Sequence, residues 1–179
     1  MVKTIAFLLA AMTGVASAGG EVDRVAKLGF RIGYGPVPIE KHEARTTTIA
    51  IGIEHPTFGK TRMFGEWEWM WINGWRDENL HGSGQRMTAG LRRAFGVLST
   101  SSTVRMFIDG ELGGGAMLAT EDRMGESAVP VGLAGLRLGY DFRNGESSSR
   151  VFEAEVLVRT IVVPTGYGIM FGVGMLWGD

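Results

Sequence analysis

The sequence predicts an all-β fold, an antiparallel up-and-down barrel of about eight strands. Three observations support this class. From residue 27 to the C-terminus, apolar and polar side chains alternate with a period of two, which is the period of a β-strand. Clusters of Gly, Ser, Asn, Asp or Pro interrupt the alternation about every 15 to 20 residues, as turns between sequential strands do. Charged residues of both signs gather on one face of the strands.

The first three strands are predicted over residues 27–34, 48–54 and 62–71. A helix would spread their apolar side chains around its axis, whereas a strand sorts them onto one face. The third segment is rich in tryptophan. The apolar face carries Leu28, Phe30, Ile32 and Tyr34, then Ile49, Ile51 and Ile53, then Met63, Trp67, Trp69 and Trp71.

The next three strands are predicted over residues 86–92, 104–112 and 135–142. The sequence before residue 135 is less regular, and Pro130 indicates a β-bulge there, because proline cannot donate a ladder hydrogen bond. The run Gly113-Gly114-Gly115 predicts a bend into a loop. The apolar face carries Met87, Ala89 and Leu91, then Val104, Met106, Ile108 and Leu112, then Leu136, Leu138, Tyr140 and Phe142.

The last two strands are predicted over residues 152–159 and 167–177. They repeat the alternation, and the chain ends on the second of them. The apolar face carries Phe152, Ala154, Val156 and Val158, then Tyr167, Ile169, Phe171, Val173, Met175 and Trp177.

The polar face of these strands is predicted to point into the barrel. It carries eight positive and eight negative side chains, and the chain has 14 Arg against 4 Lys. A solvated surface usually favours Lys, whereas guanidinium groups suit carboxylates packed closely in a narrow lumen. The predicted charged interior comprises Lys27, Arg31, Glu54, Arg62, Glu66, Glu68, Arg86, Arg92, Arg105, Asp109, Glu111, Arg137, Asp141, Glu153, Glu155 and Arg159.

The apolar face is predicted to contact lipid, which makes the fold a transmembrane barrel. Tryptophan and tyrosine are typical of the interfacial girdles of such barrels. Eight strands enclose an interior that side chains fill, so a diffusion channel is not expected. The predicted lipid-facing aromatic residues are Trp67, Trp69, Trp71, Tyr140, Tyr167, Phe171 and Trp177.

The first eighteen residues have the pattern of a cleaved signal peptide. Lys3 precedes an apolar run over 5–11, and Ala16-Ser17-Ala18 is a small-residue cleavage site. The sequence therefore predicts export, followed by a barrel domain over residues 19–179 in the bacterial outer membrane. If the first strand starts in the periplasm, the predicted outer loops are 36–45, 73–84, 114–127 and 163–166, and the shorter inner turns are 55–60, 98–103 and 143–149.

Composition excludes several classes of protein. No later segment supplies the eighteen or so apolar residues of a membrane helix. The chain has no cysteine, and its net charge of -1 gives no basic stripe for nucleic acid. His55 lies in a predicted turn far from the other two histidines, so neither a three-histidine metal site nor a cofactor is expected.

The N-terminal signal pattern, about eight amphipathic strands and a last strand that runs to Trp177 make the whole mature chain resemble small outer-membrane barrels. Within that group, Trp71-Ile72-Asn73-Gly74-Trp75, residues 107–113, and residues 135–142 with the Asn144-Gly145 turn most nearly resemble the lipid A 3-O-deacylase (PagL-like) family. In that family a His-x-Ser pair follows the Asn-Gly turn, and an acidic residue orients the histidine. The strand over 151–158 contains neither His nor Ser here, so the resemblance implies the scaffold and not the activity.

The only His-x-Ser in the sequence is His81-Gly82-Ser83, in the predicted second outer loop together with Asp77. Base, hydroxyl and acid could lie close together there, near the outer leaflet where a lipid A hydrolase acts. His42, in the first predicted outer loop, could approach the same site. His81, Ser83 and Asp77 are therefore candidate catalytic residues, against the simpler interpretation that these are solvated loop residues.

The function expected from the sequence is that of a non-enzymatic outer-membrane barrel with a role in envelope integrity or surface contact. Its expected partners are outer-membrane lipid and lipopolysaccharide, and the barrel-assembly machinery during insertion. Two alternatives stay open. One is a lipid A-modifying ester hydrolase, and the other is a soluble periplasmic lipocalin-like carrier, in which the apolar face would line the interior.

Overall fold

The structure, a computed structural model, describes residues 26–39, 42–57, 59–74, 81–100, 104–121, 125–143 and 151–178. The predicted signal peptide and Asp77 lie outside these residues. No helix in the described part of the chain is able to span a membrane.

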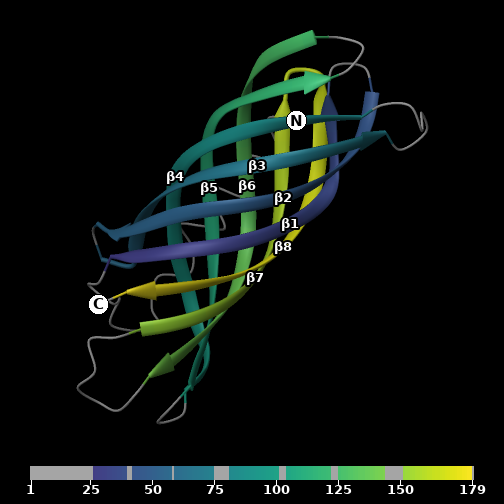
Figure 1. The fold of residues 1–179 in the computed structure, drawn as a ribbon. Helices are drawn as coiled ribbons and strands as arrows, with labels where there is room; N and C mark the ends of the chain where they lie inside the picture. Colours follow the sequence, from purple (N-terminus) through teal and green to yellow (C-terminus); the bar gives the residue numbers. More distant parts are fainter. Residues whose placement is uncertain are drawn as a thin grey trace.

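Eight antiparallel strands close into a barrel (Figure 1). Each strand pairs with the next one along the chain, and β8 pairs with β1 to complete the closure. The predicted all-β, up-and-down topology is therefore confirmed. The strands are β1 (Lys27–Ile39), β2 (His42–Pro56), β3 (Thr61–Gly74), β4 (His81–Thr100), β5 (Val104–Glu121), β6 (Gly125–Arg143), β7 (Val151–Val163) and β8 (Gly166–Gly178).

The strands are longer than the sequence pattern predicted. β4, β5 and β6 contain 20, 18 and 19 residues, because main-chain pairing continues beyond the part of each strand whose side chains alternate. The predicted loops at 73–84 and 114–127 are consequently strand over much of their length. His42 and His55, which the sequence placed in connections, belong to β2.

The two ends of the barrel are distinguished by the chain termini. β1 begins and β8 ends at one end, which we call the terminal end, and the opposite end is the hairpin end. Two connections at the hairpin end, 40–41 and 164–165, contain only two residues, whereas 144–150 at the terminal end contains seven. The prediction of longer loops at the hairpin end is therefore wrong, since the strands extend into those segments.

Pro130 does not produce the predicted bulge. It pairs with Ala116 in an unbroken register between β5 and β6. β6 pairs with β7 only from Gly132 onward, so Pro130 has a neighbouring strand on one side alone, where a missing N–H is tolerated. The register shifts of the barrel lie instead in β4, within residues 94–99.

The glycine run over residues 113–115 lies inside β5 and not at a bend. Gly113 and Gly115 face β4, where the two main chains approach closely. A Cβ atom at Gly115 would overlap the carbonyl oxygen of Met87 and lie 2.8 Å from its carbonyl carbon. These positions therefore require glycine because a neighbouring backbone occupies the space of a side chain.

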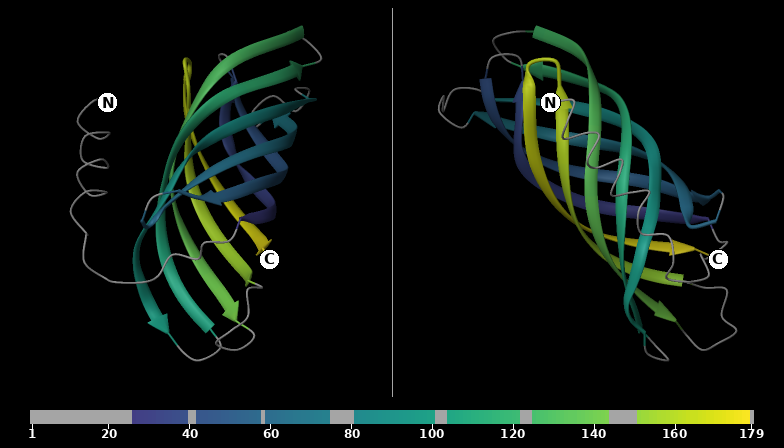
Figure 2. Two further views of the ribbon diagram at one scale, coloured as in Figure 1. Left: turned by 90° about the vertical axis from the view of Figure 1, so that its left-hand side faces the viewer. Right: turned by 180° about the vertical axis from the view of Figure 1, so that it is seen from behind.

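The strands are tilted against the long direction of the barrel, as both views in Figure 2 show. Along each strand the burial alternates, so that one set of side chains fills the interior and the other faces outward. The outward set is the apolar set that the sequence predicted. Exposed apolar side chains occur on all eight strands, from Leu28 on β1 to Trp177 on β8.

The interior has two parts of different chemistry. A network of charged side chains fills the part toward the terminal end, which agrees with the predicted charged interior. An apolar cluster, which the sequence analysis did not anticipate, fills the part toward the hairpin end. This cluster consists of Ala44, Phe64, Met70, Ile72, Met117, Val131, Leu133, Ile161, Val163 and Met170.

Candidate functional site

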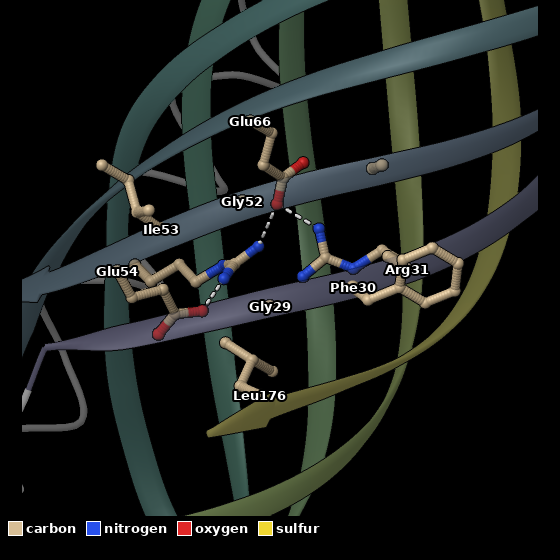
Figure 3. Close-up of a pocket in the computed structure, with 10 residues that line it drawn as sticks. Gly29, Phe30, Arg31, Gly52, Ile53, Glu54, Glu66 and Leu176 are labelled. Atoms are coloured by element: carbon tan, nitrogen blue, oxygen red, sulfur yellow. Dashed lines mark hydrogen bonds and ion pairs between the residues drawn. The ribbon is translucent and has the colours of Figure 1, made fainter. Parts of the chain in front are cut away.

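The centre of the charged network is Glu66, on β3. Its carboxylate accepts hydrogen bonds from Arg31 on β1, from Arg92 on β4 at 2.8 Å and from Arg159 on β7 at 2.8 Å. Figure 3 shows Glu66 reaching toward Arg31 across the interior. One carboxylate thereby joins guanidinium groups from three other strands.

Arg137, on β6, forms a second centre. Its Nη1 donates to Glu54 at 3.1 Å, to Glu153 at 2.6 Å and to Glu155 at 2.9 Å. Its Nε donates to Asp109 at 3.1 Å. A guanidinium has five N–H donors in a plane, and here they reach acceptors on three other strands, β2, β5 and β7.

The remaining charges extend the network to the rest of the interior, so that all sixteen charged side chains of the predicted interior form ion pairs. Arg159 also binds Glu111, and Arg92 binds Glu54 and Glu111. The outer members of the network are the pairs Lys27–Glu153 at 2.6 Å, Arg62–Glu54 at 3.5 Å, Arg105–Asp141 at 2.9 Å and Arg86–Glu68.

Two phenylalanine rings lie beneath the guanidinium groups. The Arg92 guanidinium carbon is 4.5 Å from the centroid of the Phe64 ring, and that of Arg137 is 5.3 Å from the centroid of Phe107. Cations over aromatic faces are attracted by the ring quadrupole. Phe64 also belongs to the apolar cluster, so it connects the two parts of the interior.

A small cavity lies within the charged part of the interior. This cavity of about 10 Å³ lies beside Arg31, Glu54 and Glu66 (Figure 3), which is space for about one water molecule. No three or more His, Cys, Asp or Glu side chains among the described residues are placed to hold a metal ion. The carboxylate pairs Glu66/Glu68 and Glu153/Glu155 each face arginine or lysine, which is the arrangement of a structural network.

A larger hollow of about 380 Å³ lies at the rim of the terminal end. It is open to solvent, and it is lined by β1, β2 and the end of β8, including His55 and Trp177. Its charged residues, Lys27 and Glu54, are engaged in the interior network, so the hollow offers no separate set of charged groups.

The outward face of β4 departs from the apolar pattern near the hairpin end. His81, Ser83 and Gln85 point outward and are exposed, while Gly82 and Gly84 alternate with them. These three residues form a short polar stripe on the outward face of β4.

Tryptophans of β3 lie directly beside this polar stripe. In the register of the two strands, Trp71 is opposite Ser83 and Trp69 is opposite Gln85. Trp67 Nε1 donates a 3.2 Å hydrogen bond to Gln85 Oε1, and the Trp67 and Trp69 ring centroids are 4.6 Å apart. The outward surface of β3 and β4 thus combines aromatic and polar side chains.

The structure places the candidate catalytic residues differently from the prediction. His81 and Ser83 lie in β4 and not in a loop, because pairing of β3 with β4 begins at Asn73 and His81. His81 Nδ1 lies 3.3 Å from Asn73 Oδ1, so an amide and not a carboxylate contacts the imidazole. Asp77 lies outside the described residues.

The predicted aromatic residues all lie on strand positions whose side chains face outward. Tyr140 is half-buried, and the other six are half-buried or exposed, with Tyr167 70 % exposed. Phe142 and Phe152, which the sequence analysis did not name among the lipid-facing aromatic residues, also contact each other on the outside, with ring centroids 5.9 Å apart. Their positions in the alternating pattern of β6 and β7 already indicated that both side chains face outward.

Comparisons with known proteins give matches at the level of structure. No family model and no curated protein matches the chain. Neisserial surface protein A (NspA) superimposes with a TM-score of 0.56 at 10 % identity, over 84 % of this chain and 95 % of that one. This similarity shows the fold. The shared fold is a closed antiparallel β-barrel.

Two further barrels match with lower scores. Ail, the attachment invasion locus protein of Yersinia pestis, has a TM-score of 0.49 at 7 % identity, over 88 % of this chain and 100 % of that one. The N-terminal β-barrel domain of Pseudomonas aeruginosa OprF has a TM-score of 0.46 at 10 % identity, over 89 % of this chain and 100 % of that one.

Proposed function

We propose that this protein is an integral outer-membrane barrel whose role is structural or lies in surface contact. The proposal rests on one observation: charged side chains lie in the interior of the barrel, and apolar side chains lie on its outer surface. A soluble barrel would place these two sets the other way round, since its charged residues would face water.

The energetics of the outward face support a lipid environment. Large apolar side chains such as Ile53, Phe171 and Val173 are more than half exposed. In water, such a continuous apolar surface around a barrel would drive association, because patches beyond a few hundred Å² are rare on soluble monomers. In a bilayer the same surface is solvated by acyl chains.

The filled interior favours a structural role over transport. The apolar cluster and the ion network occupy the lumen, and the cavity beside Arg31, Glu54 and Glu66 holds about 10 Å³. A lipocalin-like carrier needs a cavity of several hundred Å³ for a small ligand. The proposal therefore excludes both a carrier of the lipocalin type and an open pore.

Fractionation of cells that express the full chain tests the membrane location. We expect the protein in the outer-membrane fraction, resistant to alkaline extraction, with a gel mobility that changes on heating as the barrel unfolds. A protein recovered from the periplasm without detergent would overturn the proposal. The N-terminus of the purified protein should begin at Gly19 if the signal peptide is cleaved after Ala18.

Insertion by the barrel-assembly machinery forms part of this proposal. β8 carries alternating outward apolar residues and reaches the exposed Trp177 close to the C-terminus. Depletion of the machinery should reduce the amount of heat-modifiable protein in the outer membrane. Unchanged amounts would exclude that route of assembly.

A second candidate function is hydrolysis of an acyl ester of lipid A. It is favoured by the position of His81 and Ser83, side by side on the outward face of β4, with Asn73 as a partner for the imidazole. An amide can orient a catalytic histidine, as in Cys-His-Asn hydrolases. In the described residues, however, the hydrogen bond of His81 goes to Asn73 and none joins it to Ser83.

Mass spectrometry of lipid A tests this second function. Lipid A from cells expressing the wild-type chain should lack one acyl chain if the site is catalytic, and Ser83→Ala should restore it. An unchanged mass in the presence of folded wild-type barrel would exclude the hydrolase and leave the structural role.

A further inference from the structure

A row of polar side chains crosses the outer surface of three strands at the hairpin end. Arg45 on β2 pairs with Asn73 on β3, which pairs with His81 on β4. All three are exposed and point outward. Residues directly opposite in antiparallel strands have Cβ atoms about 4.5–5.5 Å apart, so a guanidinium, an amide and an imidazole share one small area. The 3.3 Å contact of His81 with Asn73 agrees with this closeness.

On β3 the surface changes from polar to aromatic on the side of this polar row that faces the terminal end, while the polar stripe continues on β4. The next positions along the strands are Trp71 on β3 and Ser83 on β4, followed by Trp69 and Gln85. The polar row, which includes the basic group of Arg45, therefore borders the indole rings of β3. Such a boundary is the level at which a lipid headgroup meets its acyl chains.

From this juxtaposition we infer that Arg45, Asn73 and His81 bind the phosphate-bearing headgroup of an outer-leaflet glycolipid of the lipid A type. Its acyl chains lie along Trp67, Trp69 and Trp71. The inference rests on the proposed outer-membrane location and names the lipid contact that this location would provide.

The chemistry of the row selects an anion. A guanidinium binds phosphate through two parallel N–H groups, and such charge-assisted hydrogen bonds are about twice as strong as neutral ones. The amide of Asn73 adds N–H donors, and the row itself contains no carboxylate that would repel phosphate. Ser83, the next outward residue after His81 on β4, adds a hydroxyl that can hydrogen-bond the hydroxyl groups of a sugar.

The position of the row selects the outer leaflet. An even number of strands leaves both termini on the side from which the chain inserts, which for an exported protein is the periplasm. The hairpin end, where Arg45 and His81 lie, then faces outward. Phosphorylated glycolipid forms the outer leaflet on that side, so it is the lipid that meets the row.

Native mass spectrometry of the purified, folded barrel in detergent tests the inference. The probes are lipid A, lipid A from which the phosphates have been removed, and phosphatidylglycerol. We expect lipid A to bind at least about tenfold more tightly than either of the other two, because each lacks the phosphate or the sugar. The double variant Arg45→Gln/His81→Gln should lose about tenfold or more of this affinity.

A matched control removes a positive charge elsewhere on the outward face. Arg93 lies on β4 near the terminal end, opposite Thr61, and is half-buried. Arg93→Gln changes the net charge as Arg45→Gln does, and it should leave lipid A binding unchanged. Heat-dependent gel mobility shows for every variant whether the barrel has folded.

The possible outcomes separate the inference from the proposed function. Equal binding of lipid A by the wild-type and double-variant barrels would overturn the inference while leaving a membrane barrel. Equal binding of lipid A and its dephosphorylated form by the wild type would overturn it too, and this arm needs no variant to fold. Equal binding of lipid A and phosphatidylglycerol by the wild type would overturn the inference as well, because it would show that the surface attracts any anionic lipid. A protein that is soluble without detergent would overturn the proposed function itself.

Discussion

Arg159 Nη2 donates a 2.8 Å hydrogen bond to Glu66 Oε1, which joins β7 to β3 across the interior of the barrel. The two strands are not neighbours in the sheet, so their ladder hydrogen bonds do not connect them. Glu66 accepts from Arg31 and Arg92 as well. The side chain therefore ties four strands together at one point, and its loss leaves three buried guanidinium groups with fewer acceptors.

Replacement of Glu66 should destabilise the barrel strongly. Glu66→Gln keeps the shape but removes the negative charge, and breaking a buried ion pair on one side costs about 3–5 kcal/mol. Unfolding by urea from lipid vesicles should show this loss as a lower midpoint with an unchanged slope. Glu68→Gln is the comparison, because Glu68 binds mainly Arg86. An equal loss for both variants would contradict a central role for Glu66.

The pair Lys27–Glu153 should show energetic coupling. The two atoms of this ion pair are 2.6 Å apart, and both side chains are almost completely buried. We expect Lys27→Met to cost less than Glu153→Gln, since Glu153 also accepts from Arg137. A double-mutant cycle should give a coupling energy of about 0.5–3 kcal/mol in the same unfolding experiment. Strict additivity of the two substitutions would show that the pair contributes nothing of its own.

The sequence was sufficient to predict which side chains enter the interior, because a strand has a period of two. Arg31 and Glu155 illustrate this, since the alternation of side chains along each strand alone predicted both on the inward face, where they form an ion pair. The alternation does not predict which inward residues contact each other. That depends on the stagger of the strands around the barrel, which the sequence does not encode locally.

The apolar cluster was missed for the same reason. Met70, Met117 and Met170 lie at inward positions of three strands that are far apart in the sequence, and only the closed barrel brings them together.

The bounds of the strands were not predicted correctly, for another reason. Ser83 and its neighbours pair through the main chain, and a ladder hydrogen bond does not require an alternating pattern of side chains. The sequence analysis therefore predicted a loop where β4 begins, and it placed His81 and Ser83 in that loop and not on the outer surface of a strand.

A charge on the outward face should distinguish lipid from water as the surroundings of the barrel. Val156 lies in the middle of β7 and is 48 % exposed. Val156→Arg should cost about 2–4 kcal/mol in a bilayer, whereas an arginine near the interface costs about 0–1 kcal/mol. Tyr167→Arg, beside the turn at 164–165 and 70 % exposed, is the interfacial control. If both variants unfold at the wild-type urea midpoint, the outward face is not in contact with lipid.

The barrel should not conduct ions. The inward face is closed by the apolar cluster toward the hairpin end and by ion pairs toward the terminal end. Planar bilayers containing the purified protein should show no steps of conductance above those of a bilayer without protein. Reproducible channel openings would contradict a filled lumen.

Close approach of β4 and β5 should make Gly115 far more sensitive to substitution than Gly132. At Gly115 an added methyl group meets the main chain of Met87, which cannot move without breaking the ladder. At Gly132 the nearest atom to an added Cβ is Val162 Cβ at 3.8 Å, an ordinary contact. Gly115→Ala should therefore cost about 1–3 kcal/mol through overpacking, and Gly132→Ala should stay close to wild type. Urea midpoints of the two variants, measured in the same vesicles, check this difference. If Gly115→Ala unfolds at the wild-type midpoint, the two strands have room to separate, and the glycine run has no steric role.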